Sequence, residues 1–232
     1  RIGTLRELKF ASEKYFRKEI EAEELQQIAE TLRKTHWSIQ KEAGIDYISS
    51  DDFSFYDMTL DTAVLLNIIP KCYKELELSG LDTYFAMALG YQGASGDVKA
   101  LAMKKWFNTN YHYIVPEVED DTVIQLSGNK LVDEYAEAKA LGIETKPVVI
   151  GAYTMLRLCR FTGKKPALDY VEDIISAYQN LVKKCEENQI AWVQFDEPAL
   201  VWDMEESDIA LFHKIYDGIL SCKKHSHILL QT

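Results

Sequence analysis

The sequence predicts an α/β fold of the TIM type, a (β/α) barrel that is incomplete in this chain. Two features of the 232 residues carry the prediction: segments with strand character alternate with segments of helical periodicity, and the strand segments are continuously apolar. Alternating strands and helices indicate parallel β-α units. Continuously apolar strands indicate a sheet buried on both faces. The length suffices for one large core, so residues 1–232 are expected to form a single domain.

Two helices are predicted at the start of the chain. Thr4 and Glu7 have the spacing of a capping box, which predicts a helix from Thr4 to about Arg17. A second helix is expected from Ala22 to Ala43, before Gly44. Its apolar face has spacings of three and four and consists of Leu25, Ile28, Leu32, His36 and Ile39. His36 is therefore interpreted as a core histidine.

The middle of the chain is less regular. A strand is expected at Ile45–Ser49, followed by a polar loop and by a helix at Thr59–Ile69 that stops at Pro70. Residues 71–96 are mixed and rich in turns. A short helix is expected at Asp97–Lys104. The stretches Tyr111–Val115 and Thr122–Leu126 are expected to form either a hairpin with each other or two separate excursions of the chain.

The second half has a clearer order. The expected elements are a helix at Leu131–Leu141, a buried strand at Lys146–Ile150, a loop at Gly151–Thr154, a helix at Ala167–Asn188, a strand at Ala191–Asp196, a helix at Ser207–Leu220 and a strand at His227–Gln231. The chain begins just after one strand and stops inside another. It is expected to supply about five of the eight strands of a barrel and to be a truncated or partly ordered piece of a larger protein.

Composition limits the class of partner. The formal net charge of −11 argues against a general nucleic-acid surface but leaves room for a local basic pocket. No apolar run is long enough to span a membrane, and no signal-peptide pattern is present, so no membrane partner is expected. The four cysteines, Cys72, Cys159, Cys185 and Cys222, have neither the spacing of a disulfide framework nor that of a zinc ribbon. They are expected to be buried thiols, and the protein is expected to be cytoplasmic.

The stretch Lys105–Tyr113 is the most informative in the chain. It combines one cation with a Trp-Phe pair, two amides and a Tyr-His-Tyr sequence, and it has no apolar period of 3.6 or 2. This mixture suits a ligand with an aromatic head and an anionic tail. The alternative interpretation is an aromatic patch buried under a loop. The role of His112 is left open.

A small anion site is predicted at the N-terminal end of the first helix. Free backbone N–H groups and the helix dipole favour anions there. Arg6 and Lys9 lie on one helical face, and Arg1 lies just upstream; a solvated basic face is the alternative. In a barrel, this segment and three others are expected at the carboxyl ends of the strands, namely Arg1–Lys9, Ser50–Asp57, Gly151–Thr154 and Asp196–Pro198.

Other polar groups give weaker signals. Asp51–Asp52 and Asp196–Glu197 have the composition of paired glycosidase carboxylates, but helix capping or loop hydrogen bonding is favoured. His225 and His227 share one face of a strand without further ligands at suitable spacing, so no metal site is predicted. No catalytic residue is assigned in the chain.

Several motifs occur in the order found in one enzyme family. They are Arg1-Ile2-Gly3, Arg6–Lys9, His36-Trp37, Gln40–Asp46, Asp52–Asp57, Lys105–Tyr113, Val115–Glu117, Ala138–Gly142, Lys146–Val148 and Trp192–Leu200. On these motifs the chain resembles cobalamin-independent methionine synthase, a 5-methyltetrahydropteroyltriglutamate–homocysteine methyltransferase. The resemblance covers nearly the whole chain, and Lys105–Tyr113 is its most specific part.

The resemblance implies the N-terminal barrel of a two-barrel enzyme. It implies that Arg6, Glu7, Leu8, Lys9 and Lys105 bind 5-methyltetrahydropteroyltriglutamate. It also implies that zinc and homocysteine bind in a C-terminal barrel absent from this chain, and that no cobalamin takes part. The chain alone is then expected to bind folate weakly and to catalyse nothing.

One position departs from the family pattern. Ala152 stands where the family usually has proline, which predicts a less rigid loop without an obvious effect on tail binding. Two alternatives to folate binding remain open at this point. One is a non-catalytic barrel domain that only supports the catalytic domain, and the other is an independent barrel hydrolase.

Overall fold

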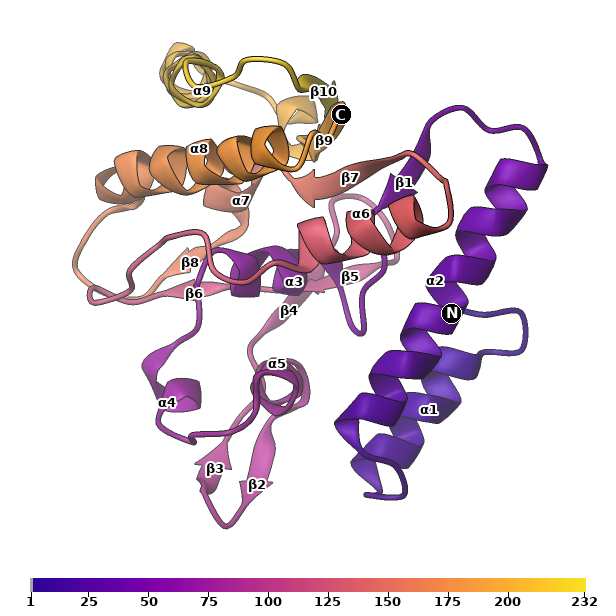
Figure 1. Ribbon diagram of the computed structural model, residues 1–232. Coiled ribbons are helices and arrows are strands. Elements are labelled where there is room, and N and C mark those ends of the chain that lie inside the picture. Colours follow the sequence, from indigo (N-terminus) through magenta and orange to yellow (C-terminus); the bar gives the residue numbers. More distant parts are fainter. Residues whose placement is uncertain (1) are drawn as a thin grey trace.

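A computed structural model describes residues 2–232, and its largest sheet has four parallel strands in the order β1-β7-β9-β10 (Figure 1). The strands are β1 (Ile48–Ser50), β7 (Thr145–Ile150), β9 (Trp192–Asp196) and β10 (His227–Gln231). Ser50 lies opposite Pro147, and Ile150 lies opposite Asp196. Because all four strands run in the same direction, their carboxyl ends lie along one edge of the sheet.

Helices pack on this sheet and enclose the larger hydrophobic core. Tyr178, Phe195 and Met155 are among its fully buried side chains. The helix α6 packs against β1 and β7, and α7, α8 and α9 pack against one another. The bounds are α6 (Lys130–Ala140), α7 (Ala152–Leu158), α8 (Val171–Glu187) and α9 (Glu206–Leu220), with 3-10 turns at Ala167–Tyr170 and Pro198–Val201.

A second region surrounds a smaller core that includes Leu25, Phe85 and Met87. Its helices are α1 (Glu7–Phe16), α2 (Ala22–Glu42), α3 (Met58–Leu65), α4 (Lys71–Lys74) and α5 (Gly80–Leu89). Three two-stranded pairs complete the fold: β2 (Tyr91–Gly93) with β3 (Gly96–Val98), β4 (Met103–Lys105) with β5 (His112–Ile114), and β6 (Glu117–Val118) with β8 (Arg160–Phe161). In Figure 1 the α1–α2 pair stands beside the rest of the molecule, while β4 and β5 lie near its centre.

Much of the predicted element order is confirmed. The helices expected at 22–43, 131–141 and 207–220 and the strands expected at 146–150, 191–196 and 227–231 agree with the structure to within one residue. Two elements are shorter than expected, since the first strand begins only at Ile48 and α3 ends at Leu65. The helix expected at 167–188 starts with a 3-10 turn before α8.

The sheet is open within residues 2–232 and is not a closed barrel there, because β1 and β10 are its two edges. The sheet has four parallel strands, whereas about five were expected. The segment around Tyr113 forms a hairpin, as one of the two alternatives stated, but its partner is β4 and not residues 122–126, and Lys105 lies opposite His112. Strands separated by a short turn close a smaller loop than distant parallel strands do, which favours this local pairing.

The predicted capping box is wrong. The helix α1 begins at Glu7, and its N-cap is Arg6 with a left-handed backbone (φ 68°) instead of Thr4. The Glu7 carboxylate accepts a hydrogen bond from the Leu5 N–H at 2.9 Å. Gly3 (φ 88°) allows this turn, because a Cβ there would lie 2.0 Å from Glu7 Oε2.

Three other local predictions are wrong. Residues 97–104 form parts of β3 and β4 and not a helix, because Val98 pairs with Tyr91 across a tight hairpin. Residues 122–126 contain no strand, and residues 152–154 belong to α7 and not to a loop. Ala152 is fully buried at the start of that helix.

Burial of side chains corrects two further expectations. On α2, Ile39 is 58% exposed, whereas Trp37 is buried and donates its indole N–H to the Ser49 carbonyl at 2.9 Å. His36 is only partly buried. Of the four cysteines, all of them free, Cys185 is buried and Cys72 is exposed; the other two are partly buried.

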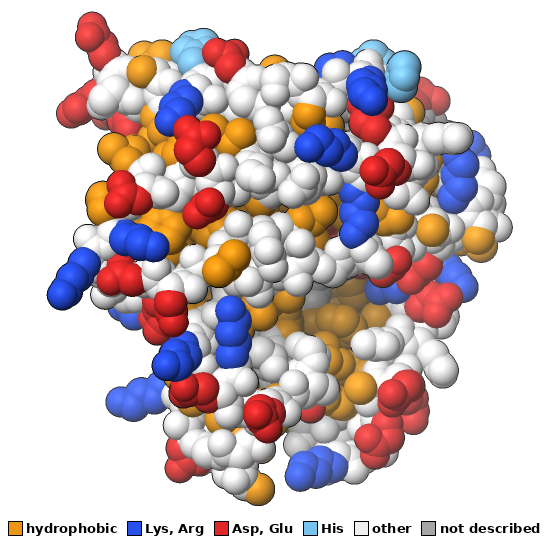
Figure 2. Space-filling view, turned by 60° about the vertical axis from the view of Figure 1, so that its left-hand side comes forward, with side chains coloured by type: hydrophobic (Ala, Val, Ile, Leu, Met, Phe, Trp, Pro, Cys, Tyr) orange, Lys and Arg blue, Asp and Glu red, His pale blue; other side chains and the backbone are white. Residues whose placement is uncertain are grey.

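The surface mixes both signs of charge. Figure 2 shows acidic and basic side chains interspersed over one face, with hydrophobic atoms on the floor of a hollow. Within residues 2–232, no helix is long and apolar enough to cross a membrane.

Candidate functional site

The predicted anion site lies at the start of α1, on the outside of the molecule. Arg6 and Lys9 are both exposed. Lys9 Nζ lies 2.5 Å from Glu13 Oε1 and 5.2 Å from the centroid of the Phe10 ring. The ion pair is exposed, so an anionic ligand can displace Glu13 at little cost. Arg1, the third predicted cation, lies outside the described residues.

Glu7 and Leu8 lie between these two cations, and their side chains contact other parts of the chain. Leu8 is 5% exposed and packs in the smaller core. Glu7 holds the turn that precedes the helix through its bond to Leu5. Of the four predicted residues at the start of α1, Arg6 and Lys9 therefore have exposed side chains, and Leu8 does not.

Lys105 is the last residue of β4 and is exposed. Neither Arg6 nor Lys105 forms an ion pair with a carboxylate of residues 2–232. The hairpin and α1 share the smaller core, where Leu8 clusters with Leu101 and Ile114. The structure thus anchors both predicted cationic segments on one hydrophobic cluster, although α1 packs mainly against α2.

The aromatic residues of the hairpin are partly packed. The Trp106 ring meets Phe107 and Tyr113 edge-on, with centroid distances of 5.0 and 5.8 Å. Tyr113 is buried, while Tyr111 is 78% exposed. His112 is exposed and lies opposite Lys105. The interpretation as a buried aromatic patch is therefore confirmed for some of the rings, such as Tyr113, while Tyr111 remains exposed; the interpretation as a ligand site stays a prediction.

Asp57 positions this hairpin, and sequence reasoning had not assigned it this role. One carboxylate oxygen accepts the Leu60 N–H at 2.9 Å and caps α3, and the other accepts the Ile114 N–H of β5 at 2.9 Å. Burial raises the pKa of Asp57 to about 6, against the lowering effect of these two N–H groups. An Asp directly before a helix signals the cap, but no local pattern signals the contact with Ile114.

At the carboxyl edge of the sheet, Glu197 is fully buried, and both of its carboxylate oxygens accept hydrogen bonds. Its oxygens accept the Tyr153 and Thr154 N–H groups at 3.0 and 2.7 Å and the Tyr216 hydroxyl at 2.5 Å. Burial raises its pKa. A Cβ on Gly151 would lie 2.3 Å from this carboxylate, so the backbone approach requires glycine. Glu197 thus binds the first turn of α7, in agreement with the capping interpretation.

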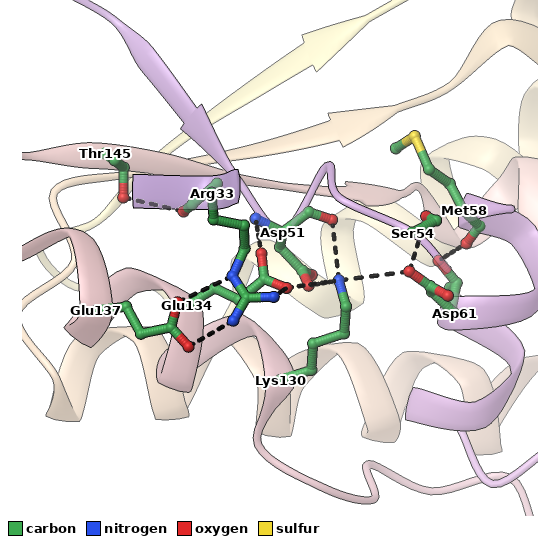
Figure 3. A network of polar contacts seen from close by, with 11 residues as sticks. Arg33, Asp51, Ser54, Met58, Asp61, Lys130, Glu134, Glu137 and Thr145 are labelled. Atoms are coloured by element: carbon green, nitrogen blue, oxygen red, sulfur yellow. Dashed lines mark hydrogen bonds and ion pairs between the residues drawn. The ribbon is translucent and has the colours of Figure 1, made fainter. Parts of the chain in front are cut away.

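Asp51, at the end of β1, belongs to a buried ionic network (Figure 3). Lys130 Nζ lies 2.6 Å from Asp51, 3.4 Å from Asp61 and 3.3 Å from Glu134. Burial raises the pKa of Asp51 to about 7, with Lys130 opposing the shift and Glu134 adding to it. Burial opposes the charge of Lys130, but the three carboxylates outweigh it and raise its pKa.

Arg33 of α2 extends the network. Its guanidinium lies 2.6 Å from Glu137 and 3.8 Å from Glu134. These groups border a groove of about 620 Å³ between α2, α3, α5 and α6. Both cations of the groove wall are neutralised by carboxylates, so this groove does not suit the anionic tail of a ligand.

The described residues do not fit a metal centre. No group of three or more His, Cys, Asp or Glu side chains in residues 2–232 is arranged to hold a metal ion. His227 stacks on Trp192 at a centroid distance of 4.6 Å, and His225 precedes the strand that the two histidines were expected to share.

These features define a mixed α/β domain with a parallel sheet, in which buried acids support the fold and exposed cations lie outside the sheet. The chain belongs to the family described as "Cobalamin-independent synthase, N-terminal domain", which matches residues 1–232. The family's name agrees with the expectation that no cobalamin takes part.

Two relatives are similar over the whole chain. It is 53% identical over 232 residues to a 5-methyltetrahydropteroyltriglutamate–homocysteine methyltransferase of Campylobacter jejuni subsp. doylei and to one of Streptococcus suis. The chain spans only 31% of the length of these relatives.

A solved structure supports the fold. A Listeria monocytogenes protein described as a vitamin-B12-independent methionine synthase superposes with a TM-score of 0.65, over 97% of this chain and 60% of that one. Its sequence identity is 15%, so this likeness bears on the fold alone.

Proposed function

We propose that the chain is the folate-binding, N-terminal part of a methyltransferase. The whole enzyme transfers the methyl group of 5-methyltetrahydropteroyltri-L-glutamate to L-homocysteine and forms L-methionine. In this proposal the chain binds the glutamate tail. Homocysteine and zinc bind in the part of the enzyme outside this chain, where zinc activates the homocysteine thiol.

The observation that carries the proposal is the exposed pair of cations at the N-terminus of α1. Arg6 is the N-cap, and Lys9 lies three residues further along the chain, so both lie beside the first turn of the helix, where the helix dipole favours anions. The chain as a whole is acidic, with a net charge of −11. Within residues 2–232, Arg6 forms no ion pair, and Lys9 pairs only with the exposed Glu13. Lys105 adds a third exposed cation on a mobile aliphatic stem, which suits a flexible carboxylate tail.

The five residues then have different roles. The side chains of Arg6, Lys9 and Lys105 pair with glutamate carboxylates. Leu8 supports the site from below, since its side chain is buried in the smaller core and its N–H donates to the Ile2 carbonyl at 3.4 Å. Glu7 shapes the turn before the helix through its bond to Leu5, which supports the ligand site indirectly.

Kinetics of the enzyme that contains this chain test the proposal. Arg6→Ala and Lys105→Ala should each raise KM for the triglutamate substrate by roughly 10- to 100-fold, because each removes a charge-assisted hydrogen bond of about 1.5–3 kcal/mol. The effect should shrink with a monoglutamate substrate, since fewer carboxylates reach the cations.

Lys104→Ala is the matched control. Lys104 is also exposed on β4, but it is the neighbour of Lys105 and therefore points to the other face of the strand. It should leave KM unchanged. Unchanged kinetics in the Arg6 and Lys105 variants would favour the alternative, a non-catalytic domain that only supports the catalytic one. The inward-facing Leu8 is the observation that favours this alternative.

A further inference from the structure

A pocket of about 360 Å³ lies between the end of α1, the start of α2 and α5. None of the residues proposed to bind the glutamate tail lines it. Its volume falls in the range of small-molecule sites. Its apolar wall consists of four aromatic and two aliphatic side chains, which are Tyr15, Phe16, Phe85, Tyr91, Ile20 and Leu89.

The wall is fixed where α1 meets α5. The Tyr15 hydroxyl donates to the Asp82 carboxylate at 2.5 Å, and the Phe16 ring meets Phe85 edge-on with centroids 4.8 Å apart. Burial and the Asp82 carboxylate raise the pKa of Tyr15 to about 12, so this hydroxyl keeps its proton. Phe16 and Leu89 nevertheless remain 46% and 51% exposed. A ligand with an apolar body would gain free energy by covering them.

Lys18 contributes the positive charge of the pocket. It follows Arg17, the C-cap of α1, and has a φ of 58°. Its N–H donates to the Tyr15 carbonyl at 2.9 Å. Glycine is the residue that helices usually place at this left-handed position, because it adopts a positive φ without strain. The turn therefore does not explain the lysine side chain.

Glu21 contributes a negative charge. It is the N-cap of α2, but its carboxylate accepts no capping hydrogen bond. Ser, Thr, Asp and Asn are the residues that cap helices best. The other carboxylate of the pocket, Asp82, is already engaged by the hydroxyl groups of Tyr15 and Ser79.

The two charges at the rim have no internal partner. Lys18 and Glu21 are exposed, and neither forms an ion pair within residues 2–232. The pocket thus presents one cation, one carboxylate and an apolar wall. An α-amino acid is complementary to all three, with a carboxylate, an ammonium group and a side chain. An apolar acid or an apolar amine would use only one of the two charges.

We propose that this pocket binds a free α-amino acid with an apolar side chain. Lys18 pairs with its carboxylate, Glu21 pairs with its ammonium group, and Phe16 and Leu89 cover its side chain. The site is independent of the proposed folate site, because the two share no residue.

Calorimetric titration of the whole enzyme that contains this chain tests the site. L-leucine is the probe, because it is neither a substrate nor a product of the proposed reaction. The variants are Lys18→Gly and Glu21→Ser, which replace each charge by a residue that the local backbone prefers. Each should weaken leucine binding about 5-fold or more, the loss of one partly exposed charge pair. The urea midpoint should stay unchanged or rise.

Lys14→Ala and Glu24→Gln are the matched controls. Both residues are exposed charges, on α1 and α2, and neither lines the pocket. Their replacement should leave leucine binding unchanged. Leu89→Ser removes apolar wall without a change of charge and should weaken leucine binding.

Two analogues of leucine test the two charges separately. Isocaproate lacks the ammonium group, so its binding should respond to Lys18→Gly and not to Glu21→Ser. Isoamylamine lacks the carboxylate and should show the opposite response.

Two results would overturn the site itself: no binding of leucine by the wild type, or equal binding by the wild type and both charge variants. Isoamylamine binding as tightly as leucine would overturn the assignment to amino acids. The folate proposal is tested by Arg6 and Lys105, whose replacement should leave leucine binding unchanged, so each proposal can fail without the other.

Discussion

The sheet region and the α1–hairpin region use their charged groups in opposite ways. At the carboxyl edge of the sheet, Glu197 and Asp51 are buried and bonded to neighbouring elements. Around α1 and β4, Arg6 and Lys105 are exposed. The sheet edge is the usual place for chemistry in parallel α/β folds. In this chain its carboxylates stabilise the fold, and the groups available to a ligand lie elsewhere.

The raised pKa values at the sheet edge have a structural cause and do not indicate an active site there. Burial raises the pKa of Asp51 and Glu197, and both groups have internal partners. Structural networks shift pKa values as active sites do. The proposed folate site depends on exposed charge instead.

The largest expected effect on stability comes from removing the Glu197 carboxylate at the sheet edge. Glu197→Ala leaves the Tyr216 hydroxyl and two N–H groups of α7 without their buried acceptor. The free energy of unfolding should fall by more than about 3 kcal/mol in urea titrations. Glu187→Ala, an exposed carboxylate at the end of α8, is the control and should change it little. A loss below about 1 kcal/mol at Glu197 would mean that water replaces the carboxylate.

The second prediction concerns pH. The pKa of Asp51 is raised from 3.8 to about 7 in the folded chain, so the folded state holds a proton that the unfolded state releases. The stabilisation of the folded state by this proton is complete below about pH 4 and is lost as the pH rises through about 7. The free energy of unfolding should therefore fall between pH 5 and pH 8.

Asp51→Asn should reduce this slope, because the side chain no longer titrates. Asparagine also tolerates the positive φ of 60° at this position. Asp133→Asn, an exposed acid on α6, should leave the slope as it is. An undiminished slope in Asp51→Asn would assign the titration to another member of the network.

The smallest expected effect on stability lies at α1. Glu13→Gln breaks an exposed ion pair with Lys9 and should leave the urea midpoint unchanged within error. Triglutamate should bind more tightly, because Lys9 no longer has to leave Glu13. Glu24→Gln, an exposed acid at the start of α2, should change neither quantity. A clear drop in the midpoint would show that α1 depends on this pair and would weaken the contrast between the two regions.

Sequence patterns predicted the regular elements well and the irregular ones poorly. Helical periodicity and continuous apolar runs located α6, α9, β7 and β9, because these elements satisfy their local preferences and bury a face at the same time. The capping box predicted from the Thr4–Glu7 spacing was wrong. Arg6 is the N-cap instead of Thr4, and the Glu7 carboxylate accepts the Leu5 N–H within the turn that precedes the helix. The expected short helix at 97–104 failed, because pairing of Tyr91 with Val98 across a hairpin overrode local propensity.

The sequence by itself determined the acidic charge, the order of strands and helices, the cations at Arg6, Lys9 and Lys105, and the motifs of the family. The tertiary structure alone decided which of these groups are buried. It left the sheet open within residues 2–232, turned the segment around Tyr113 into a hairpin, and brought Phe107 against Trp202, 95 positions later (202 − 107). Such contacts depend on how the whole chain closes its core, and no local pattern of residues encodes that closure.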